Sequence, residues 1–86
     1  MRTVTISPIA LKQLDEWKLA DPKMLSKIIS LITETATNPF EGAGKPEPLK
    51  HQLKGKWSRR INHEHRLIYE VRADTIWIIS CRYHYE

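Results

Sequence analysis

The chain has 86 residues, 41% of them hydrophobic, and a formal net charge of +4, which supplies enough apolar material for one small core and argues against a disordered chain. No apolar run approaches the roughly 18 residues that a membrane span requires, and the single cysteine, Cys81, excludes an internal disulfide. We therefore expect one domain over residues 1–86, a cytoplasmic location and no membrane partner.

The N-terminal half carries the signals of a strand and two helices. Val4 and Ile6 alternate with threonines, which predicts a strand over residues 2–7. Ser7-Pro8 and Asp21-Pro22 each combine an N-cap with a proline in the first helical position, which predicts helices over residues 8–20 and from Pro22 to Asn38-Pro39. Apolar residues recur at helical spacing in both segments: Leu11, Leu14 and Trp17 in the first, and Leu25, Ile28, Ile29, Ile32 and Ala36 in the second.

The C-terminal half predicts β structure after a long loop. Glycines and prolines concentrate in residues 40–56, where we expect a structured loop with a short strand near residues 49–53. Three strands are predicted to follow, over residues 57–62, 66–72 and 75–84. The chain is thus predicted to be an α+β protein, with two N-terminal helices packed on one face of a mainly antiparallel sheet of four to five strands.

Strand parity predicts which face of this sheet is buried. Leu67, Tyr69 and Val71 share one face of their strand, and Trp77, Ile79, Cys81 and Tyr83 share one face of the next. These odd-numbered faces are the more apolar, so we expect both of them under the helices. The numbers of paired residues must then add to an even sum such as 148, which requires a three-residue turn or a bulge. The same argument pairs Ile61 with Leu67.

The positive charge is concentrated in one segment. Seven Lys and Arg side chains but only two carboxylates, Glu47 and Glu64, lie between Lys45 and Arg66, a net charge of +5, so the rest of the chain sums to −1. This concentration indicates an anionic partner, and a phosphate backbone is the simplest one. Glu47 lies inside the segment between two prolines, where it is either a catalytic base or an ion-pair partner of Lys45 or Lys50.

Parity also places several functional candidates on the face opposite the core. Arg60, Arg66 and His84 are expected to point there, beside the loop that carries Glu47 and Lys50. Metal-free RNA cleavage needs these parts: a base for the 2′-hydroxyl, cations for the phosphorane and an acid for the 5′-oxygen. Glu47 is the candidate base, His84 the candidate acid and Arg66 the candidate phosphate clamp.

Each candidate also has a simpler interpretation. Glu47 fits a solvated ion pair, and His84 fits a frayed terminal residue. Arg66 fits an ion-pair partner of Glu64 or Glu70. Arg59 falls on the core-side parity, so we expect its side chain to reach solvent at an edge of the sheet.

The histidines and Cys81 do not form a metal-binding pattern. Cys81 and His84 are three residues apart in a predicted strand and so face opposite ways, and His63 and His65 complete no CxxC or HExxH motif. There is also no Walker loop and no GxGxxG. We expect neither a metal nor a nucleotide cofactor.

Several segments between Pro39 and Tyr85 resemble the YoeB (Txe) toxins, a family within the RelE-like ribosome-dependent mRNA endonucleases. They occur in the family's order: Phe40-Glu41-Gly42, Gly44-Lys45-Pro46-Glu47-Pro48-Leu49-Lys50-His51, Trp57-Ser58-Arg59-Arg60-Ile61, Glu64-His65-Arg66-Leu67-Ile68-Tyr69 and Cys81-Arg82-Tyr83-His84-Tyr85. The N-terminal helices resemble the family in pattern more than in residues.

The resemblance implies cleavage of mRNA in the ribosomal A site, with a 2′,3′-cyclic phosphate or 3′-phosphate left at the cut. It assigns Glu47 as general base, His84 as general acid and Arg66 as stabiliser of the phosphorane. Phosphate contacts fall to Lys50 and Arg60, with Arg59 grouped beside them, and Tyr85 positions the substrate.

The resemblance also implies partners. A YefM-like antitoxin is expected to wrap the toxin with a disordered tail and displace its C-terminal residues; a homodimer is expected as well, and operator DNA is bound only together with the antitoxin. Family members usually end at the tyrosine matching Tyr85, whereas this chain continues to Glu86. A carboxylate beside His84 favours the charged imidazole, and we expect activity to survive.

The alternative is a non-catalytic basic module that binds RNA, or that binds DNA as a co-repressor with a partner. Charge and aromatic side chains are sufficient for such binding. The joint presence of Glu47, Arg66 and His84 favours the enzyme, because a pure binder needs no acid and Glu47 would weaken its affinity for phosphate.

Overall fold

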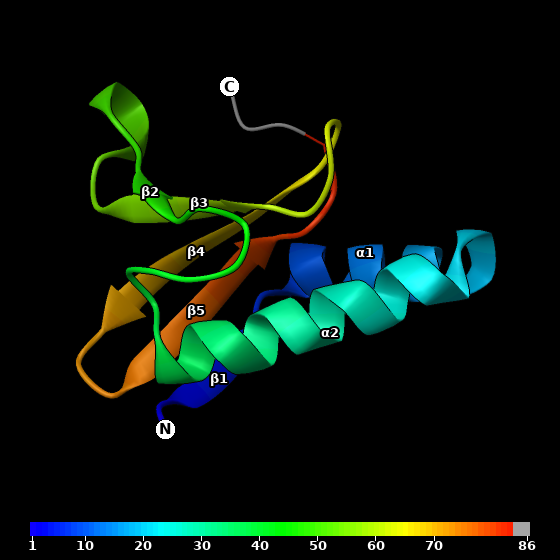
Figure 1. Ribbon diagram of the computed structural model, residues 1–86, viewed down its shortest axis with the longest axis horizontal. Helices are drawn as coiled ribbons and strands as arrows, with labels where there is room; N and C mark the ends of the chain where they lie inside the picture. Colours follow the sequence, from blue (N-terminus) through cyan, green and yellow to red (C-terminus); the bar gives the residue numbers. More distant parts are fainter. Residues whose placement is uncertain (84–86) are drawn as a thin grey trace.

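The computed structural model describes residues 1–83 and contains two helices laid against a five-stranded sheet (Figure 1). This confirms the predicted α+β fold. The helices are α1 (Pro8–Ala20) and α2 (Pro22–Thr37); the strands are β1 (Thr3–Ile6), β2 (Glu47–Pro48), β3 (Lys56–Arg60), β4 (Arg66–Arg72) and β5 (Thr75–Ser80), and a short 3₁₀ helix covers His51–Leu53.

The order of the strands places β1 and β2 at opposite edges of the sheet. The order is β1-β5-β4-β3-β2, in which β1 runs parallel to β5 and the other neighbours are antiparallel. Figure 1 shows α1 and α2 side by side near β1 and β5, with β2 at the far edge. The loop after α2 therefore crosses from the helical layer to the edge strand that carries Glu47.

Both helices begin where the sequence predicted. The Ser7 hydroxyl accepts a hydrogen bond from the Ala10 amide at 3.0 Å and donates one to the Ile79 carbonyl at 2.8 Å, so it caps α1 and ties it to β5. The Asp21 carboxylate accepts from the Met24 amide at 3.2 Å. Each cap precedes a proline in the first helical position, and α2 ends at Thr37, before Asn38-Pro39.

The core lies between the helices and the sheet. Leu67 and Tyr69 of β4 are fully buried, as predicted. Leu11 of the predicted apolar stripe is instead 61% exposed, because α1 turns Ala10 and Trp17 toward the sheet. The buried apolar cluster is Ala10, Trp17, Ile28, Leu31, Ile32, Ile61, Leu67, Tyr69, Ile76, Ile78 and Cys81.

The predicted core face of β5 is wrong for most of that strand. A two-residue turn pairs Arg72 with Thr75, so odd residues of β4 face even residues of β5, and Tyr69 lies opposite Ile78. Ile76 and Ile78 are therefore fully buried, whereas the odd-numbered Trp77 is only half-buried. The turn has its first residue, Ala73, at a φ of +49°, a conformation for which the sequence offered no glycine.

A bulge then corrects the register at the end of β5. The partner of Tyr69 is Ile78 but the partner of Ile68 is Ser80, which leaves Ile79 as the extra residue. Cys81 consequently enters the core, where it is fully buried as predicted. The sequence predicted either a three-residue turn or a bulge between these strands. The bulge is present, but it changes the pairing only at the end of β5.

The register between β3 and β4 differs from the prediction by two residues. Arg60 pairs with Arg66 and Arg59 with Leu67, whereas the sequence predicted Ile61 with Leu67. Odd residues still face odd residues, so the predicted parity of Arg60 and Arg66 holds. The predicted strand over residues 49–53 is wrong: β2 is Glu47–Pro48, and the 3₁₀ helix replaces the rest.

The strand predicted to reach His84 ends at Ser80 because α1 binds the next peptide group. The Gln13 amide oxygen accepts from the Cys81 amide at 2.7 Å, and the Trp17 indole donates to the Cys81 carbonyl at 3.0 Å. His84, Tyr85 and Glu86 lie outside the described residues, so their predicted positions stay predictions. In the part of the chain described, neither helix combines the length and the apolar character that crossing a membrane would take.

Candidate active site

A small cavity lies over the face of the sheet opposite the helices. Its volume is about 80 Å³ and its lining residues are Gly44, Lys45, Glu47, Ser58, Arg60 and Arg66; we call it the Arg60–Arg66 cavity. Strand pairing explains the set. Glu47 of β2 lies opposite Ser58 of β3, and Arg60, two residues further along the same face, lies opposite Arg66 of β4. Three strands thus bring one carboxylate and two guanidinium groups together.

The half-buried Arg66 is fixed by backbone rather than by an acid. Its Nη1 donates to the Asn62 carbonyl at 2.7 Å and to the His65 carbonyl at 3.1 Å. Of the two acids considered as its partners, Glu70 forms an ion pair with Arg72, and the exposed Glu64 lies 3.6 Å from Nε2 of His65. Within residues 1–83 Arg66 forms no ion pair, so its charge is available to an anion in the cavity.

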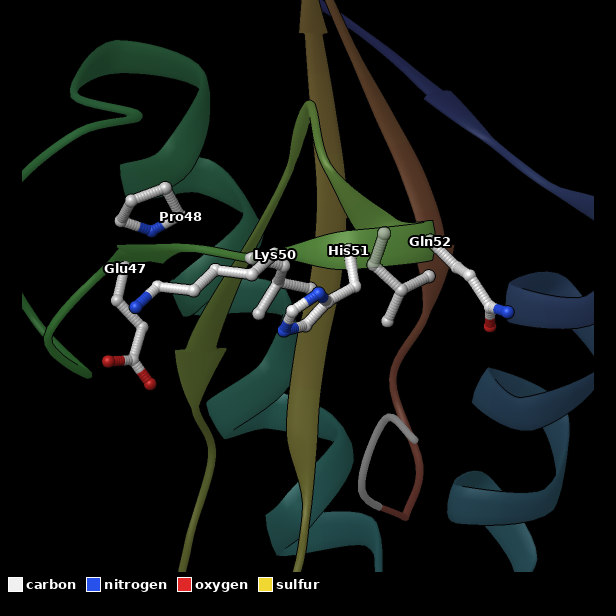
Figure 2. Close-up of a pocket in the computed structure, with 7 residues that line it drawn as sticks. Glu47, Pro48, Lys50, His51 and Gln52 are labelled. Atoms are coloured by element: carbon white, nitrogen blue, oxygen red, sulfur yellow. The ribbon is translucent and has the colours of Figure 1, made fainter.

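Glu47 is likewise not neutralised by the lysines that flank it. In the described residues it forms no ion pair with Lys45 or Lys50, and its side chain is exposed. Glu47 and Lys50 also line a neighbouring cavity of about 350 Å³ over the 3₁₀ helix. Figure 2 shows the Lys50 side chain extending in the direction of Glu47. Lys50 therefore lies next to the Arg60–Arg66 cavity rather than in its lining.

Arg59 does not reach solvent at a sheet edge, so that prediction is wrong. Its side chain is fully buried, and its Nη1 lies 2.7 Å from the Glu34 carboxylate of α2. The guanidinium also donates to the Asn38, Glu41 and Ala43 carbonyls and to the Tyr69 hydroxyl. The Arg59 guanidinium therefore points away from the cavity and is not available to a phosphate. Its hydrogen bonds instead stabilise the fold of the loop that leads to Glu47.

The loop reaches the cavity through a close contact with β3. The Arg60 amide donates to the Gly44 carbonyl at 2.8 Å. Gly44 has a φ of +79°, and a Cβ there would lie 2.7 Å from the Arg60 carbonyl oxygen, so glycine is required both by the conformation and by the space. Lys45, Pro46 and Glu47 follow directly in sequence, so the contact of Gly44 with β3 also places them close to that strand.

The segment before His84 is also anchored. The Arg82 guanidinium lies 2.9 Å from the Glu16 carboxylate and stacks over the Trp17 ring at 5.0 Å. The Tyr83 amide donates to Nδ1 of His65 at 2.7 Å, and the Tyr83 carbonyl accepts from the Arg66 amide at 3.1 Å. The chain is thus held beside Arg66 up to the last described residue.

Sequence reasoning missed three lining residues of the cavity as site residues. Ser58 shares the parity of Arg60, so strand alternation could have found it. Lys45 was considered only as a partner of Glu47, and Gly44 only as part of a motif. For metal binding, the described residues contain no cluster of three or more His, Cys, Asp and Glu side chains.

Burial raises the pKa of the Cys81 thiol to about 11, which keeps it protonated.

Comparison with known proteins identifies a consistent set of relatives. A family model described as the YoeB-like toxin of bacterial type II toxin-antitoxin systems matches residues 7–85. Toxin YoeB of Escherichia coli K12 is 56% identical over 69 residues, which cover 80% of this chain and 82% of that protein.

Two solved structures from Staphylococcus aureus match nearly the whole chain. One is a heterotetrameric YoeB-YefM toxin-antitoxin complex, with a TM-score of 0.87 and 46% identity over 99% of both chains. The other is a YoeB dimer, with a TM-score of 0.88 and 47% identity over 98% of both chains.

The contact at Gly44 predicts unequal effects of two glycine substitutions. Gly44→Ala should lower the free energy of unfolding by about 1–3 kcal/mol more than Gly55→Ala does. Both positions have positive φ, but a Cβ at Gly55 meets no atom within 4 Å. Urea denaturation of the two variants measures the difference, and equal losses would show that the close approach to β3 is unimportant.

The Glu34 carboxylate predicts part of the acid sensitivity of the fold. The Ala43 amide and the Arg59 guanidinium hold its pKa below the ordinary value of 4.5, so it stabilises the folded state above that pH and loses this effect as pH falls through the lowered value. Glu34→Gln should therefore flatten the decline of unfolding free energy below about pH 4.5. The control is Glu41→Gln, the same charge change on an exposed side chain of the loop. An unchanged acid profile for Glu34→Gln would contradict this role.

Proposed function

The chain belongs to the YoeB-like toxins of bacterial type II toxin–antitoxin systems, and from this premise we propose that it is an endoribonuclease that cleaves mRNA in the ribosomal A site. The observation that carries the proposal is the Arg60–Arg66 cavity, where Glu47 lies among cations from the loop, β3 and β4. A surface that only binds phosphate loses affinity by placing a carboxylate there. Its position therefore favours acid–base chemistry.

The proposed reaction uses the side chains of the cavity in a defined order. Glu47 takes the proton of a ribose 2′-hydroxyl, whose oxygen attacks the adjacent phosphorus. The extra negative charge on the phosphorane is stabilised by the guanidinium groups of Arg60 and Arg66, whose planar donors match phosphate oxygens. The bond to the 5′-oxygen then breaks, that oxygen takes a proton from His84, and a 2′,3′-cyclic phosphate is left.

The remaining site residues have supporting roles. We propose that Lys50, in the cavity next to Glu47, contacts a phosphate of the neighbouring nucleotide. We propose His84 as the acid from strand parity and the family resemblance, and Tyr85 as a substrate-positioning residue from the resemblance alone. Side chains handle every proton and charge in this scheme, so we propose a metal-independent enzyme that uses no cofactor.

The relatives indicate the partners. A Staphylococcus aureus relative forms a complex with YefM, and a relative from the same species forms a dimer. We propose that this chain binds a YefM-like antitoxin, forms a homodimer and binds operator DNA only together with the antitoxin. Its substrate, mRNA on the ribosome, places its action in the cytoplasm.

Primer extension on a defined mRNA bound to programmed ribosomes tests the proposed activity. The wild type should give a new stop within the A-site codon. Glu47→Gln should slow its appearance about 10²–10⁴-fold, as expected for loss of a general base, and Arg66→Ala about 10²–10³-fold, as expected for loss of a phosphorane-stabilising donor.

Two controls make the result decisive. Glu64→Gln removes an exposed carboxylate outside the cavity lining and should cleave like the wild type. The folded state of each variant is checked by circular dichroism. Ribosome binding by the wild type without any stop would overturn the nuclease and favour the non-catalytic RNA-binding module.

A further inference from the structure

A second, larger cavity lies between α2 and the end of β3. Its volume is about 470 Å³, within the range of about 300–1,000 Å³ typical of ligand sites. We call it the α2 cleft and define it by its basic residues Lys27, Lys45, Arg60 and His63 and by its apolar residues Leu31 and Ile61. Lys27 belongs to helix α2 and lies far in sequence from the basic segment 45–66.

The α2 cleft adjoins the Arg60–Arg66 cavity. Gly44, Lys45 and Arg60 line both, so the two cavities share a wall with two cations. A ligand that extends from the smaller cavity past this wall enters the α2 cleft. A polymer with a regularly repeated negative charge, such as a nucleic acid strand, fits this arrangement.

The charge of the α2 cleft is not cancelled by nearby acids. Among the described residues that line it, none is acidic. Glu34, on the same helix as Lys27, has its carboxylate bound to the Arg59 guanidinium at 2.7 Å and to the Ala43 amide at 2.6 Å. Lys27 is exposed and forms no ion pair within residues 1–83. The cleft therefore attracts an anion rather than an internal partner.

The apolar residues give the cleft a second property. Leu31 is 7% exposed and Ile61 is 1% exposed, so both belong to the core and present only a small rigid surface. Such a surface suits the packing of a ribose or a base between phosphates that are held by the surrounding cations.

We propose that the α2 cleft binds the phosphodiester backbone of the substrate RNA next to the scissile phosphate, with Lys27 as a phosphate-binding residue. This proposal rests on the proposed function, because it places the cut in the Arg60–Arg66 cavity. An acidic peptide would also be attracted by the cations. The shared wall favours the strand that already occupies the smaller cavity.

The test measures binding of a single-stranded RNA oligonucleotide that has phosphates on both sides of the cut and a 2′-deoxyribose at the cut, so that it cannot be cleaved. Fluorescence anisotropy over a range of salt concentrations compares Lys27→Gln with the wild type. We expect affinity to fall about two- to fivefold at low salt, the effect of one exposed charge pair. The plot of log affinity against log salt has a negative slope, and the magnitude of this slope should fall by about 0.7–1.

Matched variants separate this effect from a loss of net charge. Lys12→Gln makes the same change on α1, away from both cavities, and should leave affinity and slope nearly unchanged. Lys27→Arg keeps the charge and should bind like the wild type. With an oligonucleotide truncated to a single phosphate at the cut, the effect of Lys27→Gln should disappear.

The outcomes distinguish this proposal from the proposed function. If Lys27→Gln binds like the wild type while Arg66→Ala binds more weakly, the α2 cleft is overturned and the nuclease stands. If neither variant changes RNA binding, the α2 cleft is overturned, and the nuclease is judged by the cleavage assay alone, because an interaction made only in the transition state need not change substrate binding. If Lys27→Gln weakens only the association with ribosomes that carry no mRNA, the cleft contacts ribosomal RNA and the proposal is overturned. If Lys27→Gln weakens the binding of an acidic peptide but not of RNA, the proposal is overturned in favour of a protein partner.

Discussion

The fold of the functional loop depends on one buried charge, the guanidinium of Arg59. Taking an arginine out of water costs several kcal/mol unless a counter-charge and hydrogen-bond acceptors surround it, and Glu34 of α2 together with three loop carbonyls supplies both. The loop is thereby folded around the side chain and joined to the helix. Because successive residues of a strand point to opposite faces, the next residue, Arg60, emerges on the other side of the sheet. One dipeptide thus supplies both the support of the loop and a wall of the site.

This arrangement separates positioning from chemistry. Helix α2, the loop and β3 are joined on the inner face by Arg59, whereas Glu47 and Arg66 on the outer face form no ion pair within residues 1–83. Arg66 is held there by carbonyls of the 62–65 turn, and Glu47 by a two-residue strand behind a glycine that touches β3. The last described residues are bound to α1 and to His65. Hydrogen bonds within the protein therefore position Arg66 and the strand that carries Glu47 without a substrate, and donors placed in advance favour electrostatic stabilisation of a transition state.

The sequence predicted the elements better than their registers. Ser7-Pro8, Asp21-Pro22 and Asn38-Pro39 marked the helix ends because caps and prolines act locally. Register depends on turn geometry, and Ala73-Asp74 contains no glycine to indicate a two-residue turn with a positive φ, so the buried face of β5 was assigned wrongly. In the site, parity alone placed Arg60 and Arg66 together. The burial of Arg59 could not be foreseen, because its counter-charge, Glu34, is 25 residues away in sequence and only the packing of α2 brings it near.

The central claim is that the cavity of Glu47, Arg60 and Arg66 cleaves RNA by attack of a 2′-hydroxyl. The most direct measurement places a single 2′-deoxyribonucleotide at the mapped cut in an mRNA bound to programmed ribosomes, and identifies the product ends of the unmodified message by mass spectrometry. The account predicts that the modified message stays intact at that position while the unmodified one yields a 2′,3′-cyclic phosphate or 3′-phosphate. Cleavage of the modified message at the same position, or a product with a free 3′-hydroxyl, would contradict it, because neither can arise from attack by the 2′-oxygen.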